Sequence, residues 1–185
     1  MHQSWFSDLY PQIWLMTDAR NDESLEKSIK ALPRGSGIIF RHHHLDNDQR
    51  QERFQAIRAC ARRHDHILLL AGSPSLARKW GADGVHGRQW KRHQTNGLLH
   101  SAPVHNPGEI AIAQHHGADL MFLSPAFATR SHPGQKPINR LQLQRLINLS
   151  RKPVILLGGM NAVRFQQLET LGAHGWAAID GLTRL

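Results

Sequence analysis

The sequence GADGVH at residues 81–86 recurs in related form as GADLMF at residues 117–122 and as GAHGWA at residues 172–177. Each segment begins with a glycine, which is favoured just past a helix C-terminus because that position takes a left-handed backbone. The apolar residues that follow are typical of a buried strand in a parallel sheet. The three segments therefore indicate a repeated unit in which a helix ends and a strand begins.

Helical patterns precede the three segments, and apolar residues recur at helical spacing around residues 25–32 and 54–60. Short apolar runs alternate with these helices. They give eight expected strands, at residues 13–17, 37–41, 67–71, 84–86, 98–104, 120–124, 154–157 and 176–179. Strict alternation of strand and helix predicts a parallel sheet, and eight repeats close into a barrel.

We therefore predict an α/β fold in which residues 1–185 form a single compact (β/α)8 TIM barrel domain. A reduced fourth helix is expected because residues 88–97 are polar, and a reduced eighth helix because little sequence follows the eighth strand. One domain agrees with the length, since single cores usually span roughly 100–200 residues. An open doubly wound sheet is the alternative.

Composition and charge narrow the classes of function. The longest apolar run, residues 67–71, is far shorter than the about 20 residues of a membrane span, so we expect a soluble cytoplasmic protein without a membrane partner. The single cysteine, Cys60, cannot form a disulfide framework and is expected to be buried packing. The net charge of +9 comes without a nucleic-acid-binding motif, so we expect no nucleic acid partner. Formation of a homodimer is left open.

The active site of such a barrel lies at the C-terminal ends of the strands, and the loops after strands seven and eight commonly hold phosphate. Gly158 and Gly159 follow the seventh strand and leave backbone amides unshielded where the next helix begins. Ile179 and Asp180 end the eighth strand, so phosphate is expected at both loops. The Asp180 carboxylate repels phosphate unless its side chain turns away. For the two glycines, a tight turn without a ligand is the alternative.

Polar residues also close the second, fourth, fifth and sixth strands: Arg41, His86, His105, Thr129, Ser131 and His132. Histidine titrates near neutral pH, so His105 or His132 can act as a general acid or base. For His86 and His105, a structural hydrogen bond is an equal alternative to ligand contact. Residues 42–44 and the pair His64 and His66 lack a carboxylate or cysteine at a metal-binding spacing, so we assign no metal ligands.

Three segments carry a resemblance to a known family: residues 81–86, SPAFATRS at residues 124–131 and LGGM at residues 157–160. Together they resemble the thiamine-phosphate synthases and their relatives, the thiazole tautomerases, over nearly the whole chain. The resemblance implies that Gly159 and the backbone of residues 179–180 hold the phosphate of a thiazole or thiamine phosphate. It also implies that Thr129 and Ser131 line the thiazole side and that Arg41 faces a pyrimidine diphosphate.

The chain departs from the family at the expected cofactor. Family members use Mg2+ held by carboxylates to stabilise the pyrophosphate leaving group. The residues after strand three are Ala71 and Gly72, and Arg88 follows His86-Gly87 where another carboxylate is expected. Mg2+ is thus the cofactor that the resemblance implies, but its carboxylate ligands are missing, and no cofactor is certain.

Basic side chains offer a replacement for the metal, because cations can neutralise a diphosphate directly. The candidates at the strand ends are Arg41, His42, His43, His86, Arg88, His105, Arg130 and His132. We therefore expect a thiamine-phosphate synthase-like enzyme that joins hydroxyethylthiazole phosphate to a pyrimidine diphosphate and releases pyrophosphate. One alternative is a phosphate-binding or sensing barrel without turnover. Another is a thiazole phosphate isomerase acting through His105 or His132, although Pro125 stands where tautomerases carry a histidine.

Overall fold

Eight parallel strands form a closed barrel in which each strand pairs with the next in sequence and the last pairs with the first. The structure, a computed structural model, describes residues 9–88, 92–131 and 134–183. The strands are β1 (Ile13–Met16), β2 (Gly37–Phe40), β3 (Ile67–Ala71), β4 (Gly84–His86), β5 (Leu99–Val104), β6 (Leu120–Leu123), β7 (Val154–Leu156) and β8 (Gly175–Ala178). The closed order confirms the predicted barrel and excludes an open doubly wound sheet.

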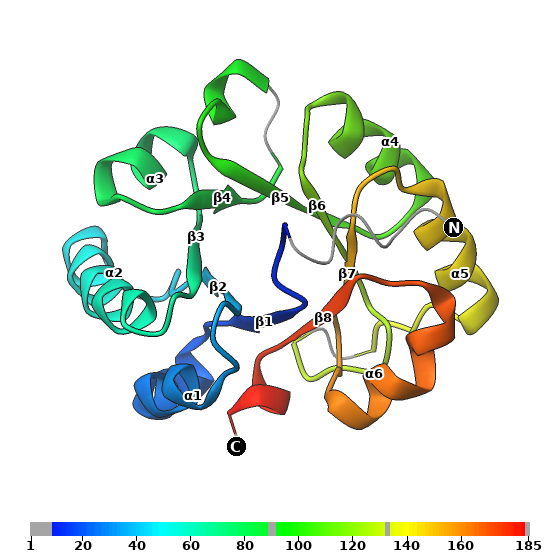
Figure 1. The fold of residues 1–185 in the computed structure, drawn as a ribbon, viewed down its shortest axis with the longest axis horizontal. Coiled ribbons are helices and arrows are strands. Elements are labelled where there is room, and N and C mark those ends of the chain that lie inside the picture. The colour runs from blue at the N-terminus through cyan, green and yellow to red at the C-terminus, as the bar shows by residue number, and fades with distance from the viewer. Residues whose placement is uncertain (1–8, 89–91, 132–133, 184–185) are drawn as a thin grey trace.

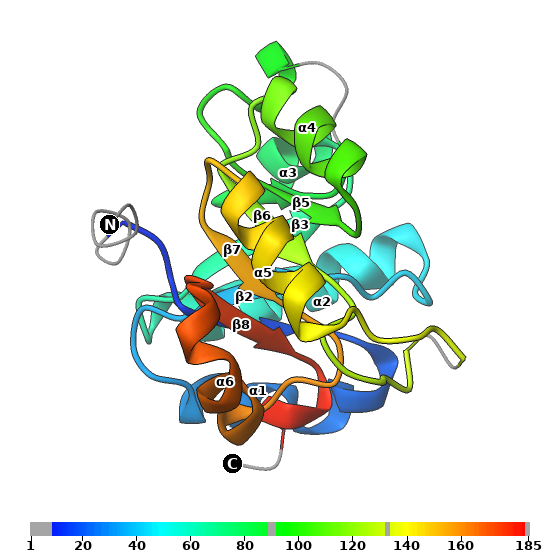
Figure 2. The same ribbon diagram turned by 90° about the vertical axis from the view of Figure 1, so that its right-hand side faces the viewer.

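The helices surround the ring of strands (Figure 1, Figure 2). They are α1 (Leu25–Ala31), α2 (Asn47–Arg62), α3 (Pro74–Trp80), α4 (Pro107–His115), α5 (Arg140–Leu149) and α6 (Ala162–Leu168). Between β4 and β5 the described residues form only the short 3-10 helix η2 (Arg92–Thr95), and η4 (Asp180–Leu182) follows β8. The fourth and eighth helices are therefore reduced, as predicted. In the described part of the chain, no helix has the length and apolar character to cross a membrane.

The repeated segments mark helix ends, as the sequence predicts. Gly81 ends α3 with a φ of 74°, and Gly172 ends the 3-10 helix η3 (Glu169–Leu171) with a φ of 80°. An L-residue is strained in this left-handed conformation, whereas glycine adopts it freely. The chain can therefore turn sharply from each helix into the next strand.

Two apolar layers stabilise the barrel. One fills its interior, where the ring of Trp14 packs edge-to-face on Phe122 with centroids 5.4 Å apart. The other lies between the strands and the helices, and it includes Cys60, which is buried as predicted. Burial of each large apolar side chain contributes about 1.5–3 kcal/mol. Because side chains fill the interior, a ligand must bind at an end of the barrel.

Candidate functional site

A cavity of about 510 Å³ opens at the C-terminal ends of the strands. Its wall is built by the ends of β1 and β8 and by the segments that follow β2, β6 and β7. The predicted site residues that line it are Arg41, Thr129, Ser131, Gly158, Gly159, Ile179 and Asp180. The residues predicted to bind phosphate, the residues predicted to line the thiazole, and Arg41 therefore all face the same cavity.

The two glycines after β7 form one wall of the cavity. Gly158 and Gly159 have φ values of 96° and 60°, and a Cβ atom on Gly159 would lie 2.4 Å from the carbonyl oxygen of Ala128. Their backbone N–H groups form no hydrogen bond with another described residue. Unpaired backbone donors need an acceptor, so this wall suits an anion whose oxygen atoms accept hydrogen bonds.

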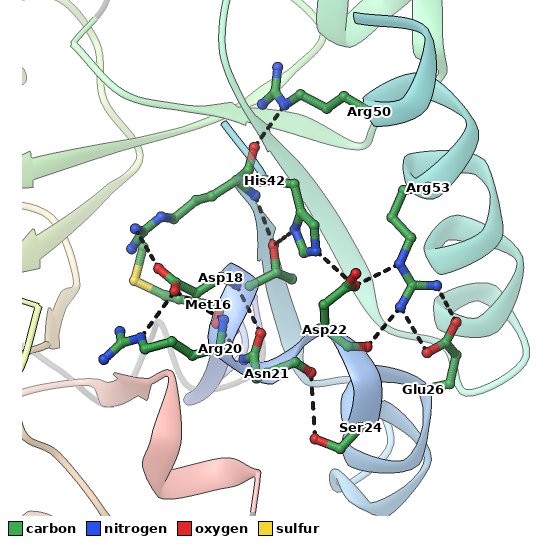
Figure 3. Close-up of polar contacts among 12 residues, drawn as sticks. Met16, Asp18, Arg20, Asn21, Asp22, Ser24, Glu26, His42, Arg50 and Arg53 are labelled. Atoms are coloured by element: carbon green, nitrogen blue, oxygen red, sulfur yellow. Dashed lines mark hydrogen bonds and ion pairs between the residues drawn. The ribbon is translucent and has the colours of Figure 1, made fainter. Parts of the chain in front are cut away.

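Arg41 is held at the cavity by Asp18, which follows β1. Nη2 of Arg41 lies 3.1 Å from Oδ2 of Asp18, and Nε of Arg20 lies 3.0 Å from Oδ1 of the same carboxylate. Figure 3 shows the contact between Asp18 and Arg20. Partial burial acts to raise the pKa of Asp18, but hydrogen bonds from Arg20 and the charges of both arginines lower it overall. Asp18 is therefore ionised and keeps Arg41 in place.

A second carboxylate, Asp180, lies at the rim after β8, the strand that pairs with β1. Its Oδ2 lies 2.9 Å from Nη2 of Arg130 and 3.5 Å from Nη1 of Arg20. Nη2 of Arg20 also donates to Oγ of Ser131 over 2.9 Å. Arg20 thus links the segments after β1, β6 and β8, and basic groups surround the cavity.

Comparison with known proteins establishes the family to which this barrel belongs. The sequence profile described as thiamine monophosphate synthase matches residues 13–182. The chain belongs to the thiamine monophosphate synthase family. A thiamine-phosphate synthase of Chlorobium limicola is 29% identical over 164 residues, which cover 84% of this chain and 78% of that protein. Membership of this family connects the chain with thiamine biosynthesis.

Solved structures of other proteins share the barrel fold of this chain. Thiamine phosphate pyrophosphorylase from Pyrococcus furiosus superposes with a TM-score of 0.80 at 21% identity, over 94% of this chain and 88% of that one. FabK from Thermotoga maritima superposes with a TM-score of 0.75 at 14% identity, over 98% of this chain and 63% of that one. Barrels with different names thus share the architecture, and the fold alone does not choose a reaction.

His42 does not face the cavity in this family member; it supports the backbone of Arg41. Oγ1 of Thr17 accepts the backbone N–H of Arg41 over 2.9 Å and lies 2.8 Å from Nδ1 of His42. Nε2 of His42 lies 2.9 Å from Oδ1 of Asp22 (Figure 3). Burial lowers the pKa of His42, and the neutral ring accepts from Thr17 and donates to Asp22.

The same network ties the mouth to the surrounding helices. Nε of Arg53 on α2 donates to Asp22 over 2.7 Å, and the Arg53 guanidinium also pairs with Glu26 on α1. Nε of Arg50 on α2 donates to the carbonyl oxygen of Arg41 over 2.7 Å. The backbone of Arg41 is therefore fixed through both its N–H and its C=O group.

His86 and His105 do not line the cavity. Nδ1 of His86 lies 2.9 Å from Oγ of Ser101, and burial, with a smaller effect of Arg41, lowers the pKa of His86 to about 3. Nδ1 of His105 lies 2.8 Å from Oε2 of Glu109, which also pairs with Arg88. His132 lies outside the described residues. The proposed roles of these three histidines stay predictions.

Arg20 and Arg164 are rim residues that the sequence reasoning missed. Arg164 donates to the carbonyl oxygen of Gly159, and its guanidinium lies 4.9 Å from the ring centroid of Phe127. The sequence did carry one signal for Arg164, because Asn161 is a favourable N-cap residue. Its side chain accepts the backbone N–H of Arg164. An N-cap at Asn161 puts Arg164 in the first turn of α6, beside the two glycines.

The described side chains at this mouth do not fit the Mg2+ ion that the family resemblance implies. Among the residues that the structure describes, no group of three or more His, Cys, Asp or Glu side chains is placed to hold a metal ion. The end of β3 offers Ala71 and Gly72, and the carboxylates of Asp18 and Asp180 already pair with arginines. We therefore assign no chemical step to a metal.

Proposed function

We propose that this barrel is a thiamine-phosphate synthase that joins hydroxyethylthiazole phosphate to a pyrimidine diphosphate and releases pyrophosphate. One observation carries the proposal beyond family membership. Arg41 and the unpaired N–H groups of Gly158 and Gly159 line the same cavity. A reaction between two phosphorylated substrates needs two groups of anion-binding donors facing one space.

Each wall of the cavity has a distinct role in this proposal. The thiazole phosphate accepts hydrogen bonds from the backbone of Gly158 and Gly159 and from residues 179–180. Thr129 and Ser131 line the thiazole ring. The pyrimidine diphosphate lies against Arg41.

The reaction transfers the pyrimidine group from oxygen to the thiazole nitrogen. The bond between the pyrimidine carrier and the diphosphate breaks, and pyrophosphate leaves with the electron pair while the new bond to nitrogen forms. Negative charge grows on the leaving group, and a fixed guanidinium stabilises that charge. The hydrogen bonds that hold the backbone of Arg41 keep its position fixed during this step.

A binding or sensing barrel without turnover is the second candidate. The ion pair between Asp18 and Arg41 favours it, because a neutralised arginine stabilises a leaving group less well. An isomerase is supported less. Its candidate acid or base His105 pairs with Glu109 outside the cavity lining.

The test compares Arg41→Ala with Arg34→Ala. Arg34 pairs with Asp65 in segments that precede β2 and β3, so it lies at the opposite end of the barrel and is a matched loss of one arginine. Thiamine phosphate is measured by chromatography in the presence of a chelator. We expect Arg41→Ala to lower turnover by about 100-fold and to leave thiazole-phosphate binding within about threefold, because the arginine acts on the leaving group.

The outcomes separate the two candidates. Binding of the thiazole phosphate without product formation by the wild type would support the sensing barrel. Turnover that is equally insensitive to both substitutions would contradict the role of Arg41. Absence of both binding and turnover would overturn the proposed function.

A further inference from the structure

The Asp180 carboxylate stands at the place where the proposed function puts a phosphate. Asp180 lines the cavity together with Gly158 and Gly159, and its Oδ2 contacts both Arg130 and Arg20. We propose that Asp180 is an internal competitor for the anion site and thereby sets its specificity. Its carboxylate pairs with Arg20 and Arg130 in this structure, and in our proposal a bound phosphate takes its place on both guanidinium groups. This inference rests on the phosphate site of the proposed function.

The exposure of the groups allows this exchange. The side chain of Asp180 is 38% exposed and that of Arg130 is 71% exposed, so both can rotate toward solvent without opening the core. The backbone of Asp180 is held independently, because its carbonyl oxygen accepts from the N–H and from Oγ1 of Thr183. The carboxylate can therefore leave the arginines while η4 keeps its shape.

Arg20 is positioned to receive the phosphate. It is held by two further partners, Asp18 through Nε and Ser131 through Nη2, over 3.0 and 2.9 Å. When the Asp180 side chain turns away, these contacts keep the Arg20 guanidinium at the rim. The cation is thus in place before the ligand arrives, and little ordering is needed on binding.

The exchange makes the site selective for highly charged anions. A ligand gains the two arginines only by displacing a carboxylate that carries one negative charge. A phosphate dianion competes well, since charge-assisted hydrogen bonds strengthen with the charge of the acceptor. A monocarboxylate offers the arginines no more than Asp180 already does, and it is disfavoured by repulsion from the displaced side chain.

The test is the affinity for inorganic phosphate, measured by titration calorimetry at low ionic strength. Asp180→Asn removes the competing charge and keeps the size of the side chain, and we expect phosphate to bind about tenfold more tightly. The matched control is Asp65→Asn, which removes one negative charge from an exposed residue that pairs with Arg34 before β3. We expect this control to change the affinity by less than about twofold, because distant surface charges are screened.

A double variant tests the exchange itself. If the freed guanidinium groups cause the tighter phosphate binding of Asp180→Asn, the double variant with Arg130→Gln should bind phosphate less tightly than Asp180→Asn alone. A gain that is undiminished in the double variant would overturn the transfer of Arg130 to the ligand.

Two further results distinguish this inference from the function on which it rests. If the wild type binds phosphate and Asp180→Asn binds it no more tightly, the inference fails and the proposed site stands. If neither protein binds phosphate, the inference and the proposed phosphate site both fail.

Discussion

Replacing His86 by asparagine should make the free energy of unfolding less sensitive to acid. The His86 ring is buried, and burial lowers its pKa to about 3 from the ordinary value of 6.5. In the unfolded chain His86 takes up a proton below about pH 6.5, whereas in the folded protein it stays neutral until about pH 3. Its effect on stability is therefore absent above pH 6.5 and becomes a growing loss as the pH falls toward 3.

The size of the effect follows from the pKa shift. One pH unit corresponds to about 1.36 kcal/mol, so between pH 6.5 and about pH 5 His86 alone removes about 2 kcal/mol from the free energy of unfolding. Most carboxylates remain ionised over this range. Asparagine places an amide near the position of Nδ1 and can keep the hydrogen bond to Ser101.

The measurement is urea unfolding followed by tryptophan fluorescence at about pH 7 and about pH 5. The wild type should lose about 2 kcal/mol more than His86→Asn between these conditions. Other buried histidines titrate in both proteins, so the difference isolates His86. His44→Asn, at an exposed histidine, is the matched control and should behave like the wild type. The same loss of stability in the wild type and in His86→Asn would refute the reasoning.

Three further results are expected. Removing Mg2+ with a chelator should change the affinity for a thiazole phosphate by less than about twofold in calorimetry, because the described residues include no group of three or more His, Cys, Asp or Glu side chains placed to hold the ion; strong metal dependence would contradict this. Gly159→Val should abolish the rise in melting temperature on adding inorganic phosphate, because a side chain at a φ of 60° meets the carbonyl oxygen of Ala128; an unchanged rise would count against the site. Thr17→Val should lower the free energy of unfolding in urea by about 1–3 kcal/mol, because the partly buried N–H of Arg41 loses its acceptor; an unchanged value would rule out this support.

Most of the architecture could be predicted because the determining features are local. Gly81 and Gly172 take the left-handed backbone that ends a helix, and the apolar runs after them form strands. Strand bounds agree with the predictions to within one residue, as at the end of β2, where Arg41 follows Phe40. Because Arg41 and Asp180 follow strand ends, the sequence was enough to predict that they lie at the same end of the barrel, where they line one cavity.

Side-chain direction at the mouth could not be predicted in the same way. His42 has a φ of 41°, which turns its ring toward Asp22 and away from the cavity, and no sequence pattern marks a non-glycine residue in that conformation. Arg20 lies in the 3-10 helix η1 (Ala19–Ser24), which is too short to show a periodic pattern. Its place at the rim comes from Ser131 and Asp180, which are distant in sequence.

The contacts at the rim depend on the pairing of β1 with β8, which closes the barrel. Arg20 follows the first strand and Asp180 follows the last, so their contact forms only when the two ends of the ring meet, as in the register of Leu15 with Ala178. Bringing such distant segments together carries the entropy cost of closing a long loop. A ligand that contacts the segments after both β1 and β8 stabilises only the closed barrel. It cannot stabilise a chain in which these two strands are not yet paired. Anion binding is therefore a property that the chain acquires on the completion of folding.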